Sequence, residues 1–305
     1  MRGVRRGAAL GIVGLVATAS VATAATSAGS SIRHAQAEVT VRSERFVDRH
    51  RRTPAVKAAH LEAKRSRTLP TTIWAPSGDG PYPLIVFAHG CNGHGRDYEP
   101  LLRTWAGAGY VVAAPDFPIS SKDTPDYTCV TDVVNQPGDV SFVITRVLEL
   151  DRAKNGLGGI VDRHHIGVAG HSLGGVTTLG VAFRSCCRDR RIDAAISFAG
   201  TPLIRGTDFR KVKTPLMLVH GDADPTVEYG ASLASFHRAQ GRRFLLTILG
   251  GDHGGYIGGT DPVSQTVLRA TLDFWAGELR GDDTALARVE TDGVLPGATT
   301  LQQAG

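Results

Sequence analysis

A serine within a glycine-rich turn is the first residue of this sequence that could do covalent chemistry. Residues 170–174 read Gly-His-Ser-Leu-Gly, which places Ser172 in a G-x-S-x-G pattern. The pattern alone has little specificity because the chain contains 37 glycines, but an apolar run at 165–169 precedes it and a helical pattern follows it. A strand, a sharp turn and a helix in that order expose a serine hydroxyl as a nucleophile. We therefore predict that Ser172 attacks a carbonyl group in an acyl-transfer reaction.

A serine hydroxyl becomes a strong nucleophile only when a base removes its proton, and that base needs an orienting acid. Both residue types follow Ser172 in the order Ser, Asp, His, each just after an apolar, strand-like run. His253 stands among glycines, where a histidine has little structural reason to be, and we predict that it is the base. Asp222 and Asp224 are both candidates for the acid, and either could instead bond to the backbone of its own turn.

An acyl-transfer site also needs two backbone N–H groups that hold the oxyanion. The residue after the nucleophile, Leu173, supplies the first of them. The loop after the apolar run at 83–88 reads His-Gly-Cys-Asn-Gly, and we assign the second donor to Cys91, with Asn92 as the alternative. An ordinary glycine-rich turn between a strand and a helix would explain the same loop without a catalytic role.

The elements that must position these residues alternate along the chain. The strand-like runs are 83–88, 110–114, 165–169, 194–198, 215–219 and 244–249, and the helical stretches between and after them are 99–107, 140–151, 173–183, 231–239 and 263–280. This alternation predicts an α/β fold with a mostly parallel central sheet and helices on both faces. Because the carboxyl ends of parallel strands meet at one edge of a sheet, the candidate residues should meet there.

Four segments together resemble the α/β-hydrolase superfamily over roughly residues 68–280: PLIVFAHGCNG, GHSLGG, LVHGDADP and GGDHGG. Within it, the chain is similar to a dienelactone-hydrolase-like group that includes bacterial cutinase-like polyester hydrolases, chlorophyllases and platelet-activating-factor acetylhydrolase. The resemblance implies the α/β-hydrolase fold and hydrolysis of carboxylic esters without a metal or organic cofactor. It also favours Asp224 over Asp222, since the acid of related hydrolases lies several residues past the strand and just before a proline or small residue.

Two positions depart from the cutinase-like members of this group. Cys91 stands where they carry an aromatic residue and Leu173 where they carry methionine, so the resemblance does not extend to cleavage of aromatic polyesters. We also expect no cap domain, because only the sixteen residues 199–214 separate the two strand-like runs between which many relatives insert one. Ser172 should then lie in an open groove that accepts lipid, aliphatic polyester or plant-wall esters.

The remainder of the chain divides into three parts. Residues 1–24 combine three arginines, an uncharged apolar run and the small residues Ala22-Thr23-Ala24, which is typical of a secretory signal peptide rather than a membrane anchor. Residues 25–67 form a basic segment, with ten Lys or Arg against four Asp or Glu, that we expect to be a solvated arm. The catalytic domain covers 68–280, and residues 281–305 lose the helical periodicity and should form a loose C-terminal tail.

Four cysteines follow the signal peptide: Cys91, Cys129, Cys186 and Cys187. An even number in an exported protein favours disulfides over metal ligands, and no C-x-x-C motif supplies a zinc site. We predict a bond between Cys91 and Cys129, because both lie in loops at the catalytic edge and the bond would brace the oxyanion loop. Cys186 and Cys187 would then form a vicinal disulfide, although four cysteines allow three connectivities.

These features together predict a secreted, extracellular serine hydrolase that cleaves carboxylic esters, including lipid or polymeric ones. We expect a monomer without cofactor, metal or, once the signal peptide is removed, a membrane span. A nucleic-acid partner is not expected either, since residues 68–305 carry a net charge of about −4. Three alternatives stay open: a secreted acyltransferase or a peptidase with the same triad, and a non-catalytic binding protein.

Overall fold

The structure is a computed structural model, and it describes residues 37–305 except for the side chains of residues 126 and 127. The strands are β1 (Val39–Asp48), β2 (Arg67–Pro76), β3 (Tyr82–Ala88), β4 (Val111–Pro115), β5 (Val161–His171), β6 (Ile192–Phe198), β7 (Leu216–Gly221), β8 (Arg243–Ile248) and β9 (Thr299–Ala304). The α-helices are α1 (Glu99–Gly107), α2 (Gln136–Arg152), α3 (Leu173–Phe183), α4 (Tyr229–Arg238), α5 (Pro262–Arg280) and α6 (Asp283–Asp292). Three 3-10 helices complete this part of the chain: η1 (Lys57–Ala59), η2 (Gly95–Tyr98) and η3 (Asp126–Asn135).

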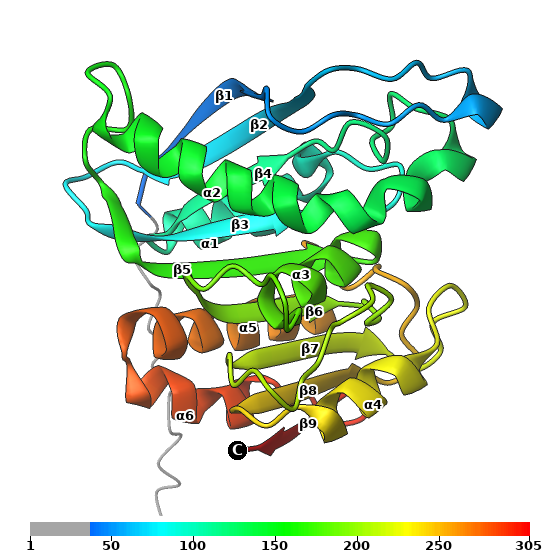
Figure 1. Cartoon of the computed structure of the whole chain (residues 1–305). Helices are drawn as coiled ribbons and strands as arrows, with labels where there is room; N and C mark the ends of the chain where they lie inside the picture. Colours follow the sequence, from blue (N-terminus) through cyan, green and yellow to red (C-terminus); the bar gives the residue numbers. More distant parts are fainter. Residues whose placement is uncertain (1–36) are drawn as a thin grey trace, which may run out of the picture. The chain divides into compact units, whose positions relative to one another are not determined.

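A single sheet of the described residues contains all nine strands in the order β1-β2-β4-β3-β5-β6-β7-β8-β9 (Figure 1). The six central strands, β3 to β8, run parallel to their neighbours, whereas β1, β2 and β9 pair in antiparallel fashion. The sheet is therefore mostly parallel, as predicted. Because β3, β5, β7 and β8 point the same way, the loops that follow them emerge at one edge, on the right in Figure 1.

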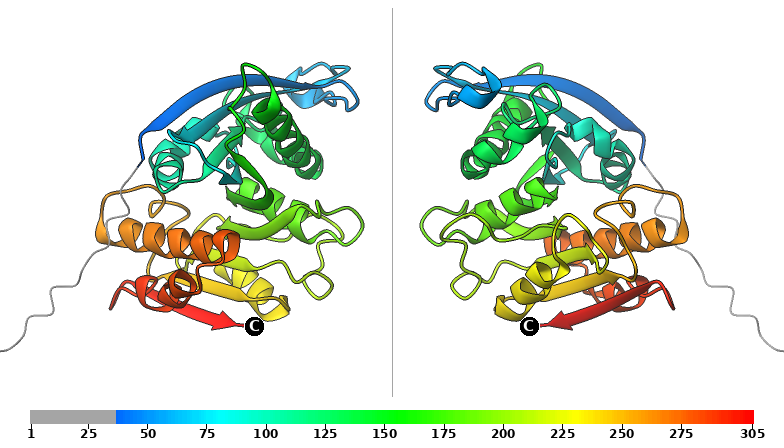
Figure 2. Two further views of the ribbon diagram at one scale, coloured as in Figure 1. Left: turned by 90° about the vertical axis from the view of Figure 1, so that its left-hand side faces the viewer. Right: turned by 90° about the vertical axis from the view of Figure 1, so that its right-hand side faces the viewer.

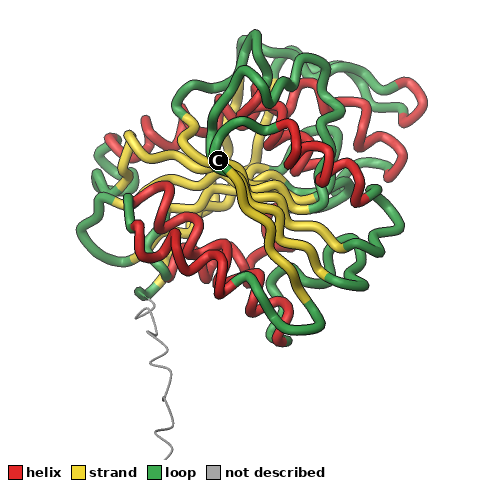
Figure 3. The backbone as a smooth tube through the Cα atoms, turned by 90° about the horizontal axis from the view of Figure 1, so that it is seen from below, coloured by secondary structure: helices red, strands yellow, loops and turns green. Residues whose placement is uncertain are grey.

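Helices cover both faces of this sheet, as two further views and the backbone trace show (Figures 2 and 3). Helices α2, α3 and α4 pack on one face, and α1, α5 and α6 pack on the other. Amphipathic spacing explains the packing: α5 buries Val267, Ala270 and Phe274 at intervals of about one helical turn. The predicted α/β-hydrolase fold is confirmed by this arrangement.

The basic segment is not the solvated arm that its charge suggests. Its described part includes β1, which pairs with β2 along its full length, from Val39 opposite Pro76 to Asp48 opposite Arg67. Arg67 itself is buried, with its guanidinium between the Asp132 and Asp139 carboxylates at 2.5 Å from each. Composition misled here because β1 carries charged residues on the same face as its buried Phe46: Asp48 is buried as well, and Arg42 and Glu44 are only partly exposed.

The expectation of a loose tail at 281–305 is also wrong. After Gly281, Asp282 caps the N-terminus of α6 by accepting the Ala285 N–H, and the chain then returns as β9 beside β8. Both elements are short, and β9 is a polar edge strand with few inward side chains, so neither carries a clear hydrophobic period. The predicted signal peptide, residues 1–24, lies outside the described residues.

The segment between β6 and β7 contains no cap domain. Residues 199–215 form loops with neither a helix nor a strand, apart from one isolated bridge between Thr207 and Arg184. The carboxyl edge of the sheet therefore has no inserted domain at this position, in agreement with the prediction.

Candidate active site

Three side chains from different strand ends form a continuous chain of contacts. His253 Nε2 lies 2.8 Å from Ser172 Oγ, and His253 Nδ1 lies 2.7 Å from Asp224 Oδ2. Ser172 directly follows β5, Asp224 follows β7 and His253 follows β8. The parallel sheet thus brings together the three residues chosen from the sequence, although Ser172 and His253 are 81 positions apart.

The turn at Ser172 holds the serine in a conformation that non-glycine residues rarely adopt. Its φ is 55° and its ψ is −118°, which costs a residue with a side chain about 1–3 kcal/mol. The Ser172 N–H donates to the Phe198 carbonyl at 2.8 Å, and the Ser172 carbonyl accepts the Val176 N–H at 3.0 Å. Glycine is needed close by, because a Cβ on Gly174 would overlap the carbonyl oxygen of Ala88 on β3.

The Asp224 carboxylate is completely buried and fully hydrogen-bonded. Besides the contact with His253, its Oδ1 accepts the N–H groups of Thr226 at 2.7 Å and Val227 at 3.0 Å. Burial raises the pKa of Asp224, but the hydrogen bonds from His253 and from these two N–H groups outweigh it, so the pKa is lowered overall. The other candidate, Asp222, accepts the Gly250 N–H at 2.6 Å on the exposed side of the loops.

The two predicted oxyanion donors follow neighbouring strands of the sheet, β5 and β3. Leu173 is the first residue of α3, so its N–H has no acceptor within the helix. Cys91 follows β3 in the neighbouring loop. The N–H of the alternative donor, Asn92, donates to the Ser120 carbonyl at 2.9 Å.

A disulfide joins the oxyanion loop to the segment after β4. Cys91 is bonded to Cys129 of η3, with their Cα atoms 5.2 Å apart, which confirms the predicted pairing. The same segment also meets the loop through an isolated bridge between Gly93 and Ser121. The second bond joins Cys186 to Cys187 in the exposed loop after α3.

A neutral histidine connects the His253 loop to the oxyanion loop. Burial lowers the pKa of His171 to about 4, although its hydrogen bond to the His253 backbone acts in the opposite direction. In its neutral form, His171 Nε2–H donates to the His253 carbonyl at 2.6 Å, and Nδ1 accepts from the Tyr98 hydroxyl at 2.8 Å. The Tyr98 oxygen in turn accepts the Gly90 N–H at 3.2 Å. The sequence analysis did not find Tyr98, which lies in η2 without a motif around it.

A second histidine contacts the acid and was also missed. His220 is fully buried near the end of β7, and its Nε2 lies 3.1 Å from Asp224 Oδ2. The signal was present, since His220 precedes Asp224 by four residues, but a histidine inside a strand-like run reads as part of the core.

The site is open to solvent on one side. The side chain of His253 is 22% exposed. Three large apolar side chains at the carboxyl edge are more exposed still: Val130 and Val134 of η3 at 57% and 58%, and Leu203 after β6 at 66%.

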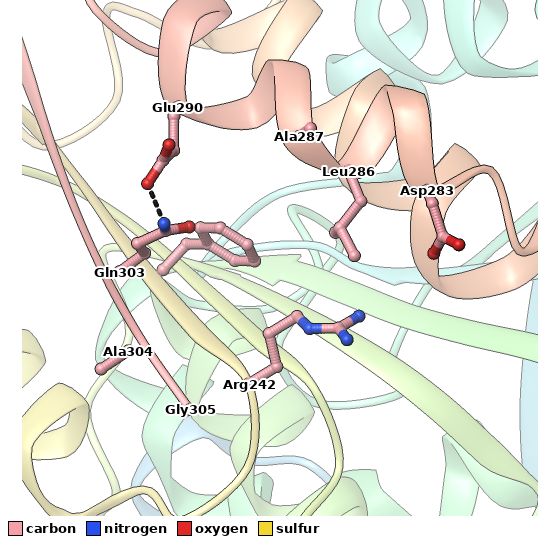
Figure 4. A pocket seen from close by; sticks show the side chains of 9 residues that line it. Arg242, Asp283, Leu286, Ala287, Glu290, Gln303, Ala304 and Gly305 are labelled. Carbon is pink, nitrogen blue, oxygen red and sulfur yellow. Dashed lines mark hydrogen bonds between the residues drawn. The ribbon is translucent and has the colours of Figure 1, made fainter.

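A cavity of about 430 Å³ lies elsewhere, between α6 and the β8–β9 edge (Figure 4). Its lining includes Arg242, Leu286, Glu290 and Gln303, and it contains none of the predicted site residues. Within residues 37–305, no group of three or more His, Cys, Asp or Glu side chains is arranged to hold a metal ion. No helix in the same part of the chain is long and apolar enough to cross a membrane.

Comparison with known families adds to this geometry. The family described as Chlorophyllase matches residues 46–221. The chain belongs to the chlorophyllase family. Membership in the chlorophyllase family confirms the predicted resemblance and implies a hydrolase that acts on ester bonds. The match includes Cys91 and Ser172 but ends before Asp224 and His253. No curated protein sequence matches the chain.

Proposed function

We propose that the chain is a secreted serine hydrolase that cleaves carboxylic esters through an acyl-enzyme on Ser172. The contact chain from Ser172 through His253 to Asp224 carries this proposal, because a base oriented by a buried carboxylate is what a serine nucleophile needs. The strained, partly exposed turn at Ser172 and membership in a family of ester hydrolases support the same reaction.

The proposed reaction has two halves. His253 Nε2 accepts the Ser172 proton while Oγ forms a bond to the ester carbonyl carbon, and the N–H groups of Leu173 and Cys91 hold the resulting oxyanion. The carbonyl bond re-forms, the alcohol leaves with the proton from His253, and the acyl group stays on Ser172. Water then repeats these steps and releases the acid. Throughout, Asp224 accepts the Nδ1–H of His253 and stabilises the imidazolium that forms.

The substrate class follows from the edge that surrounds the serine. Val130, Val134 and Leu203 expose apolar surface there, and residues 199–215 insert no cap. Exposed apolar surface at the sheet edge that carries the nucleophile suits esters with large apolar acyl or alcohol groups, such as lipids or aliphatic polyesters. Export is proposed from the signal-peptide pattern at 1–24, and disulfides are expected in the oxidising compartments that export reaches.

Kinetics of Ser172→Ala test the proposal. Turnover of a soluble nitrophenyl ester should fall by several orders of magnitude, to about the residual rate that binding and oxyanion donors alone provide. Full activity in a pure, folded Ser172→Ala protein would rule the mechanism out. Adding an acceptor alcohol and analysing the products separates hydrolase from acyltransferase, and a panel of peptides tests the peptidase alternative.

A further inference from the structure

We infer that His220 is a positioning residue for the triad: it donates a hydrogen bond to Asp224 Oδ2 and so fixes the carboxylate that orients His253. This inference rests on the proposed function. His220 Nε2 lies 3.1 Å from Asp224 Oδ2, the same oxygen that His253 Nδ1 contacts at 2.7 Å. Two histidines, one on β7 and one in the loop after β8, therefore converge on one carboxylate oxygen, and only His253 contacts the serine.

The surroundings of His220 determine which of its nitrogens carries the proton. Nε2 faces two acceptors, Asp224 Oδ2 at 3.1 Å and the Val227 carbonyl at 3.0 Å, so a lone pair there would be repelled. Nδ1 lies 2.7 Å from the Ser232 hydroxyl of α4, which can donate to it. Burial lowers the pKa of His220, in agreement with a neutral ring that has its hydrogen on Nε2.

The carboxylate of Asp224 is held on every side by these contacts. Its Oδ1 accepts two backbone N–H groups, those of Thr226 and Val227, and its Oδ2 accepts from His220 and His253. Without His220, Oδ2 would keep a single hydrogen-bond donor, His253 Nδ1–H. That donor belongs to the ring whose other nitrogen must face Ser172. The carboxylate could then rotate, and the imidazole would lose its fixed orientation toward Ser172.

Removing this donor should also change the electrostatics of the base. The groups that face Asp224 and His253 are His220 of β7, His171 of β5, Asp252 beside His253, and the Tyr256 hydroxyl. A carboxylate that has lost one hydrogen-bond donor carries more charge on Oδ2 and holds the His253 imidazolium more tightly. The acidic limb of the kcat/KM profile should then move to higher pH, since His253 must lose its proton before it can act as a base.

The decisive variants are His220→Phe, which keeps the ring volume without a donor, and His220→Gln, which keeps an amide N–H at about the Nε2 position. We expect His220→Phe to lower kcat by about 10- to 100-fold with little change in KM, and to shift the acidic limb upward. His220→Gln should retain most of the wild-type kcat and keep the acidic limb of the kcat/KM profile at its wild-type pH. Ser232→Ala should cause a smaller loss, and no additional loss in the His220→Phe background, because both act through one contact.

Thr247→Val is the matched control. Thr247 lies on β8 opposite His220 and is buried to a similar degree. Its replacement by valine removes one hydrogen bond, to the Tyr229 hydroxyl, but Thr247 makes no hydrogen bond to Asp224. Thr247→Val should leave kcat and the acidic limb of the kcat/KM profile unchanged.

Two results would overturn the inference. One is a His220→Phe variant with the wild-type kcat and pH profile. The other is a loss of kcat in Thr247→Val equal to that in His220→Phe, with no shift of the acidic limb in His220→Phe. If His220→Phe does not fold, His220→Gln and Ser232→Ala decide the question in the same way. Activity that survives Ser172→Ala would instead contradict the proposed function itself.

Discussion

In the proposed mechanism, Asp224 keeps the hydrogen of His253 on Nδ1 and stabilises the imidazolium that forms. In Asp224→Asn, the amide can point its NH₂ group at His253, so the imidazole takes the other tautomer and offers Ser172 a hydrogen instead of a lone pair. We predict a loss in kcat of about 10³- to 10⁴-fold with the fold intact, measured with a soluble ester. Asp222→Asn is the control and should retain activity, because Asp222 accepts the backbone N–H of Gly250 in the loop after β8 and does not contact His253. The reverse ranking would assign the acid to Asp222.

The residues of the candidate site differ in how well they could be predicted from the sequence. Ser172 and His253 stand in glycine-rich segments directly after strands, so local pattern sufficed to find them. Asp224 could be preferred to Asp222 only through the resemblance to related hydrolases. His220 and Tyr98 act through contacts made by the tertiary structure, with Asp224 and His171 respectively, and no local spacing reports such contacts.

Among the elements, the loop that carries Cys91 depends on a disulfide to a separate segment. Cys91 and Cys129 are 38 positions apart, so the bond should stabilise the fold by about 2–4 kcal/mol and also hold the proposed oxyanion donor in place. We predict that Cys91→Ser/Cys129→Ser lowers both the melting temperature and kcat. Cys186→Ser/Cys187→Ser, which opens a bond between adjacent residues, should change neither. A destabilised Cys91→Ser/Cys129→Ser variant with wild-type kcat would show that the bond does not position the donor.

The junction of β3, β5 and α3 has no room for an additional methyl group at Gly174. Because its Cβ would overlap the Ala88 carbonyl, we predict that Gly174→Ala lowers the free energy of unfolding by about 1–3 kcal/mol, together with activity. In α4, Gly230 faces only the flexible end of Glu228, and Gly230→Ala should be neutral or slightly stabilising. Chemical denaturation of the two variants makes the comparison, and equal stabilities would contradict the close packing inferred at the turn.

The parallel strands and their helices were predictable because each is buried on both faces or carries an apolar stripe. The misses lie at the two ends of the sheet. β1 places Arg42, Glu44 and Asp48 on the same face as Phe46, and β9 is almost entirely polar, so neither has a clear apolar alternation. The strand that each one pairs with, rather than its own residues, decides that it is a strand. Edge strands of this kind are specified by the sheet they join.

At the scale of the whole molecule, three buried histidines make stability depend on pH. Burial lowers the pKa of His89, His171 and His220 in the folded protein, whereas an unfolded histidine titrates near pH 6.5. Between about pH 6.5 and 4 the unfolded chain thus binds more protons than the folded one, and the free energy of unfolding must fall as the pH falls. Asp273, whose pKa burial raises to about 6, and Asp139, Asp193 and Glu278, whose pKa values burial also raises, oppose this trend, whereas hydrogen-bonded carboxylates with a lowered pKa, such as Asp224 and Asp189, add to it.

We therefore predict a net loss of stability from pH 6.5 to 4.5, measured as the denaturation midpoint at each pH. In His171→Gln, one of the three titrating histidines is gone, and the slope of stability against pH should decrease by up to one proton, about 1.4 kcal/mol per pH unit. A wild-type protein whose midpoint stays constant over this interval would show that the histidines are not buried in neutral form.

The central claim is that Ser172 is a nucleophile activated by His253 and Asp224, and covalent labelling tests it most directly. A fluorophosphonate reacts with an activated serine hydroxyl and leaves a stable adduct, so the mature protein should gain the mass of one label, and peptide mapping should place that label on Ser172. The labelling rate should fall sharply in a His253→Ala variant, and labelling should disappear in Ser172→Ala. A folded, ester-hydrolysing protein that takes up no label, or takes it up on another residue, would contradict the account.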